Sequence, residues 1–183
     1  TDIIAPQLRN VGMVTDAVWM DTDEDGDLDL VITGEWMPIK VFANILNEVA
    51  NADTISTIFK EITEESGLSN TEGWWNSLDI ADIDDDGDLD LIAGNLGLNS
   101  YLNASPEEPV KLYLNDFNDD QKADPIVVRT EGTNEFPLAN VDELFEQLPG
   151  LRRDFNSYDA VSGFTVQDWF SKADLDSSIQ KNA

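Results

Sequence analysis

Short apolar runs alternate with acidic clusters along the chain up to about residue 130. Each acidic cluster follows one apolar run and is followed at once by another. Runs of about four to six residues rich in Val, Ile and Leu and bounded by Asp and Gly are typical of β-strands. The pattern therefore predicts three pairs of strands, each joined by an acidic turn. The paired runs begin at Ala17 and Leu28, at Ser77 and Leu89, and at Lys111 and Asp124.

The links between these pairs predict further strands. Apolar residues alternate before an asparagine in 39–44 and in 99–104, which indicates one more strand in each stretch. The polar segment 47–59 is expected to be an exposed loop, and 61–68 a turn or a short strand. Several short strands per repeat suggest the blade of a repeat protein.

The pattern changes after about residue 140. Val141, Leu144, Phe145 and Leu148 recur at helical spacing, with Asn140 as the expected N-cap. Apolar spacing continues through 151–158, and the sequence TVQD at 165–168 has the form of a capping box before a helix that includes Trp169 and Phe170. We therefore divide the chain into a strand-repeat segment, 1–139, and a mostly helical segment, 140–183.

Composition narrows the chemistry. The chain has 183 residues, 41% of them hydrophobic, and carries 38 acidic against 10 basic residues, a net charge of −28. This charge excludes nucleic acid and anionic membrane surfaces as expected partners and favours cations. Neither cysteine nor histidine occurs, so thiolate sites, disulfides and histidine-based catalysis are excluded. There is no apolar run long enough for a transmembrane helix and no visible targeting signal.

The three acidic clusters share a nine-residue spacing. Counted from the first aspartate, oxygen-bearing side chains stand at positions 1, 3, 5 and 9 of every copy, and position 6 is Gly26, Gly87 or Gln121. A hard cation such as Ca²⁺ takes about six to eight oxygen ligands, which alternating carboxylates and one backbone carbonyl supply. Position 7 is expected to give that carbonyl, because the lysine found there in the third copy cannot ligate through its side chain. Position 7 is Asp27, Asp88 and Lys122.

Acidic clusters also occur in EF-hands and in plain solvated turns. An EF-hand requires a glutamate at position 12 and flanking helices. Here position 12 is Ile32, Ala93 or Val127, and both flanks read as strands, so an EF-hand is rejected. A solvated acidic turn is the simpler interpretation of a single cluster. Three copies at matching positions favour a bound cation, because neighbouring carboxylates repel one another by about 1–4 kcal/mol at roughly 4 Å.

The pattern D-x-D-x-D-G-x-x-D-L between strands resembles the FG-GAP or VCBS repeat of integrin-α-type β-propellers, from about Val11 to Val128. The stretches GEWMPIKVF, GWWNSLDIADIDDDGDLDLIAGNLGLN and QLPGLRRDF are similar to bacterial VCBS-repeat proteins related to cartilage acidic protein. The resemblance implies an exported protein, at the cell surface, extracellular or periplasmic, with a partial propeller of about three calcium-loop blades and up to three Ca²⁺ ions. The side-chain ligands that it implies are Asp21, Asp23, Asp25 and Asp29; Asp82, Asp84, Asp86 and Asp90; and Asp116, Asn118, Asp120 and Asp124.

The sequence departs from this family in two respects. Gln121 replaces the loop glycine of the third copy, so a weaker third site is expected. Three repeats cannot close a ring of about four to eight blades, so we expect the remaining blades, or another chain, to complete it.

The expected function is non-enzymatic binding or scaffolding, with a protein or glycan as the ligand. The alternative is a carbohydrate-active propeller enzyme, or its sugar-binding part, that uses Trp36, Trp74 and Trp75. Tryptophans in short-stranded repeats more often pack between blades than stack on sugars. Glu35 beside Trp36 is the one local candidate for a catalytic carboxyl, and the arginines of 151–155 are expected to pair with nearby acids.

Overall fold

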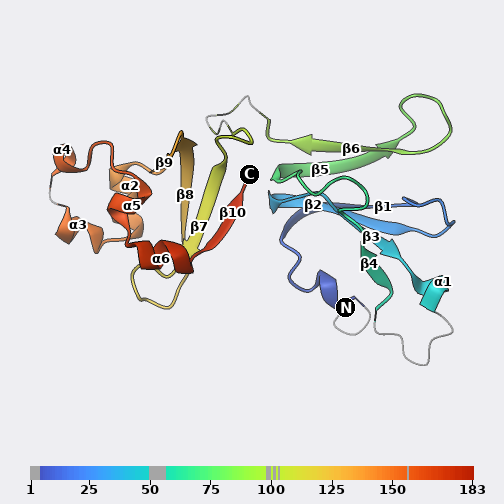
Figure 1. Cartoon of the computed structure of the whole chain (residues 1–183), viewed down its shortest axis with the longest axis horizontal. Helices are drawn as coiled ribbons and strands as arrows, with labels where there is room; N and C mark the ends of the chain where they lie inside the picture. The colour runs from blue at the N-terminus through green and yellow to red at the C-terminus, as the bar shows by residue number, and fades with distance from the viewer. Residues whose placement is uncertain (1–4, 50–56, 98–99, 101, 103, 156) are drawn as a thin grey trace. The chain divides into compact units, whose positions relative to one another are not determined.

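The computed structural model describes residues 5–49, 57–97, 100, 102, 104–155 and 157–183. The chain forms two compact units, residues 1–97 and 98–183 (Figure 1). Strands make up 37% of the described residues and helices 19%, which confirms the expectation of a mainly β chain. The sequence pattern places a division at residue 139, where the helical spacing begins. The compact units divide earlier because the third strand pair packs with the helices.

The first unit is a six-stranded antiparallel sheet in the order β4-β3-β2-β5-β6, with β1 also paired to β2. The acidic clusters join β1 to β2 and β5 to β6. A short 3-10 helix, Pro6–Leu8, precedes the sheet, and helix α1, Leu46–Val49, follows β3. The strands are β1 Met13–Met20, β2 Asp29–Met37, β3 Lys40–Asn44, β4 Phe59–Glu61, β5 Gly73–Ala81 and β6 Asp90–Asn95.

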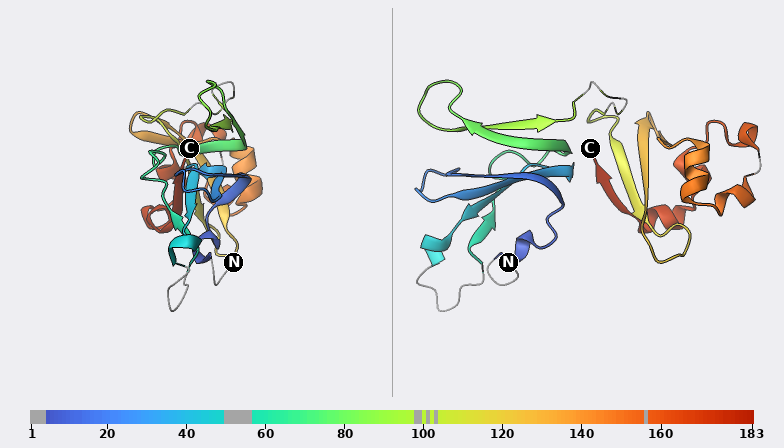
Figure 2. Two further views of the ribbon diagram at one scale, coloured as in Figure 1. Left: turned by 90° about the vertical axis from the view of Figure 1, so that its right-hand side faces the viewer. Right: turned by 180° about the vertical axis from the view of Figure 1, so that it is seen from behind.

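Strand β2 organises this unit. It pairs with β1 from Asp29 to Glu35, with β3 along its first part and with β5 at its end, where Glu35 lies opposite Trp74. Because β1 and β5 are both antiparallel to β2, they run in the same direction. Thr15 donates a hydrogen bond of 2.8 Å to the Trp75 carbonyl, and the Leu78 N–H donates one of 2.8 Å to Asp16. Both acidic turns therefore lie at one end of the unit, as Figure 2 shows.

The core of the first unit lies on both faces of β2. Val31 packs with Val41 of β3 and Leu78 of β5 in one cluster. Leu30 and Phe42 belong to the cluster on the other face. The alternating side chains of a strand point to opposite faces, so a strand covered on both sides reads as a continuous apolar run. This explains the run LVIT that follows Asp29 in the sequence.

The second unit is a four-stranded antiparallel sheet in the order β10-β7-β8-β9, with five short helices. The third acidic cluster joins β7 to β8. The strands are β7 Val110–Asn115, β8 Asp124–Glu131, β9 Asn134–Pro137 and β10 Ile179–Asn182. The helices are α2 Val141–Gln147, α3 Leu151–Asp154, α4 Tyr158–Val161, α5 Val166–Trp169 and α6 Lys172–Ser177.

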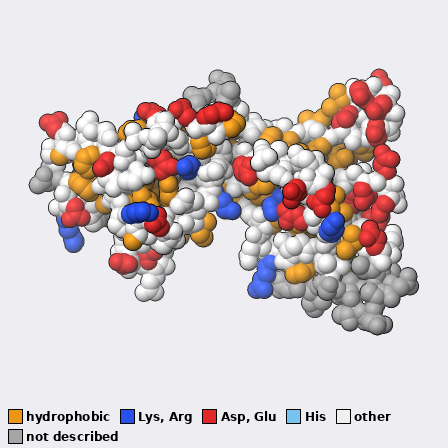
Figure 3. Space-filling view, in the orientation of Figure 1, with side chains coloured by type: hydrophobic (Ala, Val, Ile, Leu, Met, Phe, Trp, Pro, Cys, Tyr) orange, Lys and Arg blue, Asp and Glu red, His pale blue; other side chains and the backbone are white. Residues whose placement is uncertain are grey.

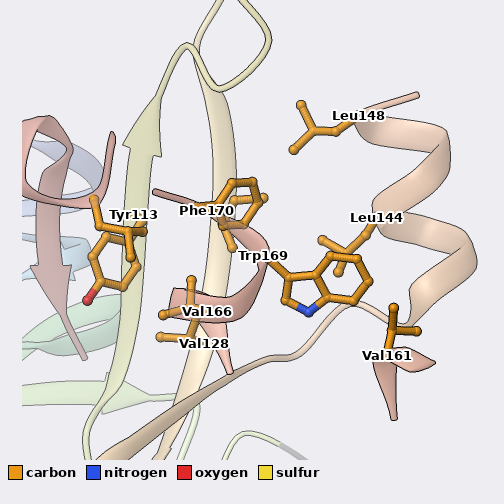
Figure 4. Packing of buried hydrophobic residues seen from close by; sticks show 10 residues of the cluster. Tyr113, Val128, Leu144, Leu148, Val161, Val166, Trp169 and Phe170 are labelled. Atoms are coloured by element: carbon orange, nitrogen blue, oxygen red, sulfur yellow. The ribbon is translucent and has the colours of Figure 1, made fainter. Parts of the chain in front are cut away.

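The helices of the second unit cover one face of its sheet. Figure 4 shows Trp169 of α5 among Leu144 of α2, Val161 of α4 and the strand residue Val128. Asn140 accepts hydrogen bonds from the N–H groups of Asp142 and Glu143, which completes a capping box at the start of α2. The predicted start of this helix is thus confirmed, as is the capping box at Thr165.

Several details differ from the sequence-based expectations. Residues 46–49 form helix α1, whereas the sequence pattern predicted an exposed loop from residue 47, and β4 occupies 59–61. Residues 179–182, assigned to the helical segment, form strand β10 beside β7. The strand expected over 99–104 falls largely outside the described residues. Neither sheet closes on itself within the described part of the chain.

Candidate metal centres

The three acidic loops have the same hydrogen-bonding pattern. The N–H of position 6 donates to the carboxylate of position 1, at 3.0, 3.1 and 2.7 Å in the first, second and third loops. The N–H of position 2 donates to the carboxylate of position 9, at 2.9, 2.8 and 3.1 Å. The N–H of position 7 donates to the carboxylate of position 5, at 3.0, 3.3 and 2.9 Å. The sequence repeat is therefore also a repeat of backbone geometry.

Two positions of each loop have a left-handed backbone conformation. At position 4, φ is 62°, 59° and 60° for Glu24, Asp85 and Asp119. At position 6, φ is 92° for Gly26, 106° for Gly87 and 69° for Gln121. Glycine reaches this region at little cost, whereas other residues are strained there by about 1–3 kcal/mol. Gln121 thus adopts the same turn as the two glycines. The third site is therefore expected to be weaker because the backbone is strained at Gln121, and not because its loop has a different shape.

The first loop brings three of its predicted ligands together. Oxygens of Asp21, Asp23 and Asp29 all lie within 4.8 Å of one another. Asp29 is only 1% exposed, and its carboxylate accepts hydrogen bonds from the backbone N–H and the hydroxyl of Thr22 and, at 2.7 Å, from the N–H of Asn44 in β3. The aspartate at position 9, Asp29, is therefore held in place by hydrogen-bond donors of the protein itself.

Two other predicted residues of the first loop lie outside this group of three. Asp25 accepts the Asp27 N–H through its carboxylate. The side chain of Asp27 accepts a hydrogen bond of 3.1 Å from Asn47 in α1, and its Oδ1 is buried without a hydrogen-bond partner. Ligation through the Asp27 carbonyl stays a prediction.

The second loop is more exposed. Asp82, Asp84 and Asp86 place oxygens within 4.8 Å of one another, and all three side chains are exposed. Asp90, the counterpart of Asp29, is also exposed and accepts the Ile83 N–H. Asp88 is hydrogen-bonded to Asp86, which raises the pKa of Asp88.

The third loop contains an amide at position 3. The backbone N–H of Asp120 donates to both Asp116 Oδ1 and Asn118 Oδ1, at 2.9 Å in each case. These two oxygens therefore both point toward the Asp120 N–H. Asp124 is 8% exposed, and this burial raises the pKa of its carboxyl. The Lys122 side chain is exposed, with its ammonium 4.0 Å from Asp120. Among the described residues, groups of three acidic side chains within 4.8 Å occur only in the first two loops.

Crowding of carboxylates changes their acidity. Loss of solvent, followed by the negative charges of Asp29 and Asp25, raises the pKa of Asp23. Loss of solvent also raises the pKa of Asp27, with contributions from the same two neighbours. Figure 3 shows acidic side chains gathered at the loop end of the first unit. A cation would remove this repulsion, and an all-oxygen donor set suits a hard ion such as Ca²⁺.

The tryptophans proposed for sugar stacking are largely occupied by protein contacts. Trp36 is 9% exposed, and its ring meets Trp74 edge-on at a centroid distance of 4.8 Å. The indole N–H of Trp75 donates to the Thr71 carbonyl at 2.6 Å. Arg152 of α3 lies over the ring of Phe145, at 5.6 Å from its centroid.

A buried polar cluster in the second unit has no counterpart in the sequence-based expectations. Glu135 of β9 is 7% exposed and is hydrogen-bonded by Lys111 and Tyr113 of β7, and more weakly by Gln167 of α5. Burial alone would raise the pKa of Glu135, but the hydrogen bonds from Lys111 and Tyr113 outweigh it and the pKa is lowered. Among 38 acidic residues, no local signal distinguishes this glutamate.

Comparisons of the chain with protein families, curated proteins and solved structures found no match. No helix in the described residues is long and apolar enough to cross a membrane.

Proposed function

We propose that this chain is a calcium-binding, non-enzymatic segment of an FG-GAP or VCBS-type β-propeller that binds or scaffolds a partner. The observation that carries the proposal is the threefold occurrence of one loop: the same hydrogen bonds and the same two left-handed residues, each time between paired antiparallel strands. Solvation alone would not require the same loop geometry and the same oxygen-bearing side chains in all three copies.

The ligands would come from positions 1, 3, 5 and 9. In the first loop, Asp21, Asp23 and Asp29 already lie together, and Asp25 is two residues from Asp23. Calcium accepts irregular shells of about six to eight oxygens, whereas Mg²⁺ demands a near-ideal octahedron. A loop that supplies several carboxylates at once therefore favours calcium. The bound ion would neutralise repelling charges and hold the two strands of its hairpin together.

Strand order supports the propeller part of the proposal. Strands β1 to β4 pair consecutively as an antiparallel set, which is the arrangement of one propeller blade, although β2 also pairs with β5 at its end. The acidic loop then recurs between the first two strands of the next sets, β5–β6 and β7–β8. On this proposal, further blades or another chain complete the ring. Calcium near millimolar in an exported compartment would fill sites with a Kd of about 10⁻⁴ to 10⁻³ M.

Thermal unfolding with calcium, magnesium and EGTA tests this proposal. Calcium at about 100 times its Kd should stabilise the folded chain by about 2.7 kcal/mol per site, and EGTA should reverse the effect. Asp23→Asn should reduce the calcium-dependent rise in Tm, whereas Glu24→Gln is the matched control, because Glu24 lies outside the expected cage. A Tm that is the same in calcium and in EGTA would contradict the proposal.

The carbohydrate alternative has less support, since Trp36 is packed against Trp74. Adding a panel of glycans to the same melting experiment examines it directly. Stabilisation by a sugar, without any by calcium, would favour the alternative.

A further inference from the structure

The base of the third acidic loop contacts the helices of the second unit at three points. We call helices α2 to α6, residues 141–177, the helical cover. Asn115, just before the loop, donates hydrogen bonds of 2.9 Å to the Asp174 carbonyl and 3.0 Å to the Ser177 hydroxyl, both in α6. Just after the loop, the Pro125 carbonyl accepts a hydrogen bond of 2.9 Å from Gln147 of α2.

The third point of contact is inside the loop. The ring of Phe117, at position 2, packs on Phe170 with a centroid distance of 4.4 Å. The backbone N–H of the same residue donates to Asp124, the ninth residue of the loop. Phe117 therefore connects an expected cation ligand to the apolar core that the cover forms on the sheet. A shift of α5 would move Phe117 and with it the donor that holds Asp124.

The first two loops lack this arrangement. Position 2 is Thr22 in the first loop, where the hydroxyl bonds within the loop to Asp29, and Ile83 in the second, which is 65% exposed. The first aspartate is exposed in both of these loops, whereas Asp116 of the third loop is half-buried. The first loop contacts helix α1 through Asp27 and Asn47, but among the described residues only the third copy packs its position 2 side chain on the helical cover.

We propose that Phe117 and Asn115 are positioning residues, through which the helical cover holds the third loop in its cation-binding geometry. The inference rests on the proposed calcium function. The third copy needs such support because Gln121 bears the strain of a left-handed backbone that glycine avoids, and because Lys122 places a positive charge beside the ligands. By thermodynamic reciprocity, a cation in the third loop must in turn stabilise the cover.

Hydrogen exchange of the full chain, measured by mass spectrometry during a calcium titration, tests this inference. Calcium should slow exchange in the third loop, 116–124, and, at the same calcium concentration, in α5 and α6. Phe117→Ala should raise the calcium concentration needed for half-protection of 116–124 by roughly three- to tenfold, the equivalent of losing one aromatic pair. In Phe117→Ala, the calcium concentration needed for half-protection of 21–29 and of 82–90 should be the same as in the unchanged protein.

Controls separate positioning from general damage. Ile83→Ala changes the equivalent residue of the second loop, whose side chain is exposed, and should leave the calcium response of 82–90 unchanged. Phe117→Leu retains an apolar contact with Phe170 and should restore most of the loss. If Phe117→Ala does not fold, Asn115→Ala takes its place as the test. Asn115→Ala should shift the third loop in the same direction.

The outcomes distinguish this inference from the proposed function. Protection of the first and second loops by calcium, without any change in α5 and α6, would overturn the inference and leave the function standing. An unchanged half-protection point of 116–124 in Phe117→Ala would also overturn it. A chain in which no loop responds to calcium would overturn the proposed function, and the inference with it.

Discussion

The first and second acidic loops both read DGDLDL over their last positions, yet their ninth aspartates lie in different surroundings. Asp29 is 1% exposed and accepts hydrogen bonds from Thr22 and from Asn44 in the neighbouring strand β3. Asp90 is exposed and accepts one from Ile83, inside its own loop. The repeat thus defines the backbone of each loop, while residues outside the repeat decide how firmly its last ligand is held.

The cause of the difference is the strand that follows. After β2 the chain turns at once into β3, and α1 then brings Asn47 to Asp27. No strand within the described residues borders β6 on its other side. In the absence of a cation, the first loop is therefore expected to be more ordered than the second.

Replacing the aspartate at position 9 should give the largest difference in stability between variants of the first and second loops. In EGTA, Asp29→Asn should lower the free energy of unfolding of the first unit by about 2–4 kcal/mol, because buried backbone donors lose their charged acceptor. Asp90→Asn should cost under about 1 kcal/mol, since water can replace the lost bond. Urea unfolding followed by tryptophan fluorescence measures both, as four of the five tryptophans lie in residues 1–97. Equal losses would contradict the comparison.

A smaller effect is expected from the contact of the first loop with α1. Asn47→Ala should cost about 0.5–1.5 kcal/mol, because it removes the hydrogen bond to Asp27, whose other oxygen is already buried without a partner. Glu48→Ala, on the same short helix, is the control and should be nearly neutral. The same urea experiment gives both values. If the two variants behave alike, α1 does not support the loop.

The smallest expected effect is on pH dependence. The pKa of Asp23 and of Asp27 is raised, so the folded loop favours their protonated forms. Their contribution is complete below the unfolded pKa of about 3.9 and is lost as the pH rises through the higher folded pKa. In EGTA, opening of residues 21–29 should therefore increase from about pH 4 upward.

Hydrogen exchange corrected for its intrinsic pH dependence measures this opening. In the second loop the pKa of Asp88 is raised while that of its partner Asp86 is lowered, so the two effects oppose each other and a weaker dependence is expected. Asp23→Asn should flatten the profile of the first loop. A steeper profile in 82–90 than in 21–29 would reverse the comparison.

Local sequence signals predicted much of the fold. The apolar runs around each acidic cluster correspond to β1–β2, β5–β6 and β7–β8, and the cap at Asn140 marks the start of α2. Strands β9 and β10 were not predicted. Strand β10 is four residues long, exposed at every residue and without alternation, and it exists because β7 offers it an edge. Closure of the strands into a propeller stays a prediction.

The candidate site, like the fold, was determined partly by local sequence and partly by the tertiary structure. The spacing of oxygen-bearing residues by itself determined three loops of one shape, with glycine at position 6 in two of them and Gln121 in the third, because turn geometry depends on φ and on hydrogen bonds within nine residues. Only the tertiary structure decided that Asp29 is buried, that Asp27 turns to Asn47, that Glu135 joins Lys111 and Tyr113, and that Phe117 packs on Phe170. Each of these depends on a donor or an apolar surface supplied by residues outside the loop or strand concerned, and folding alone brings such residues together.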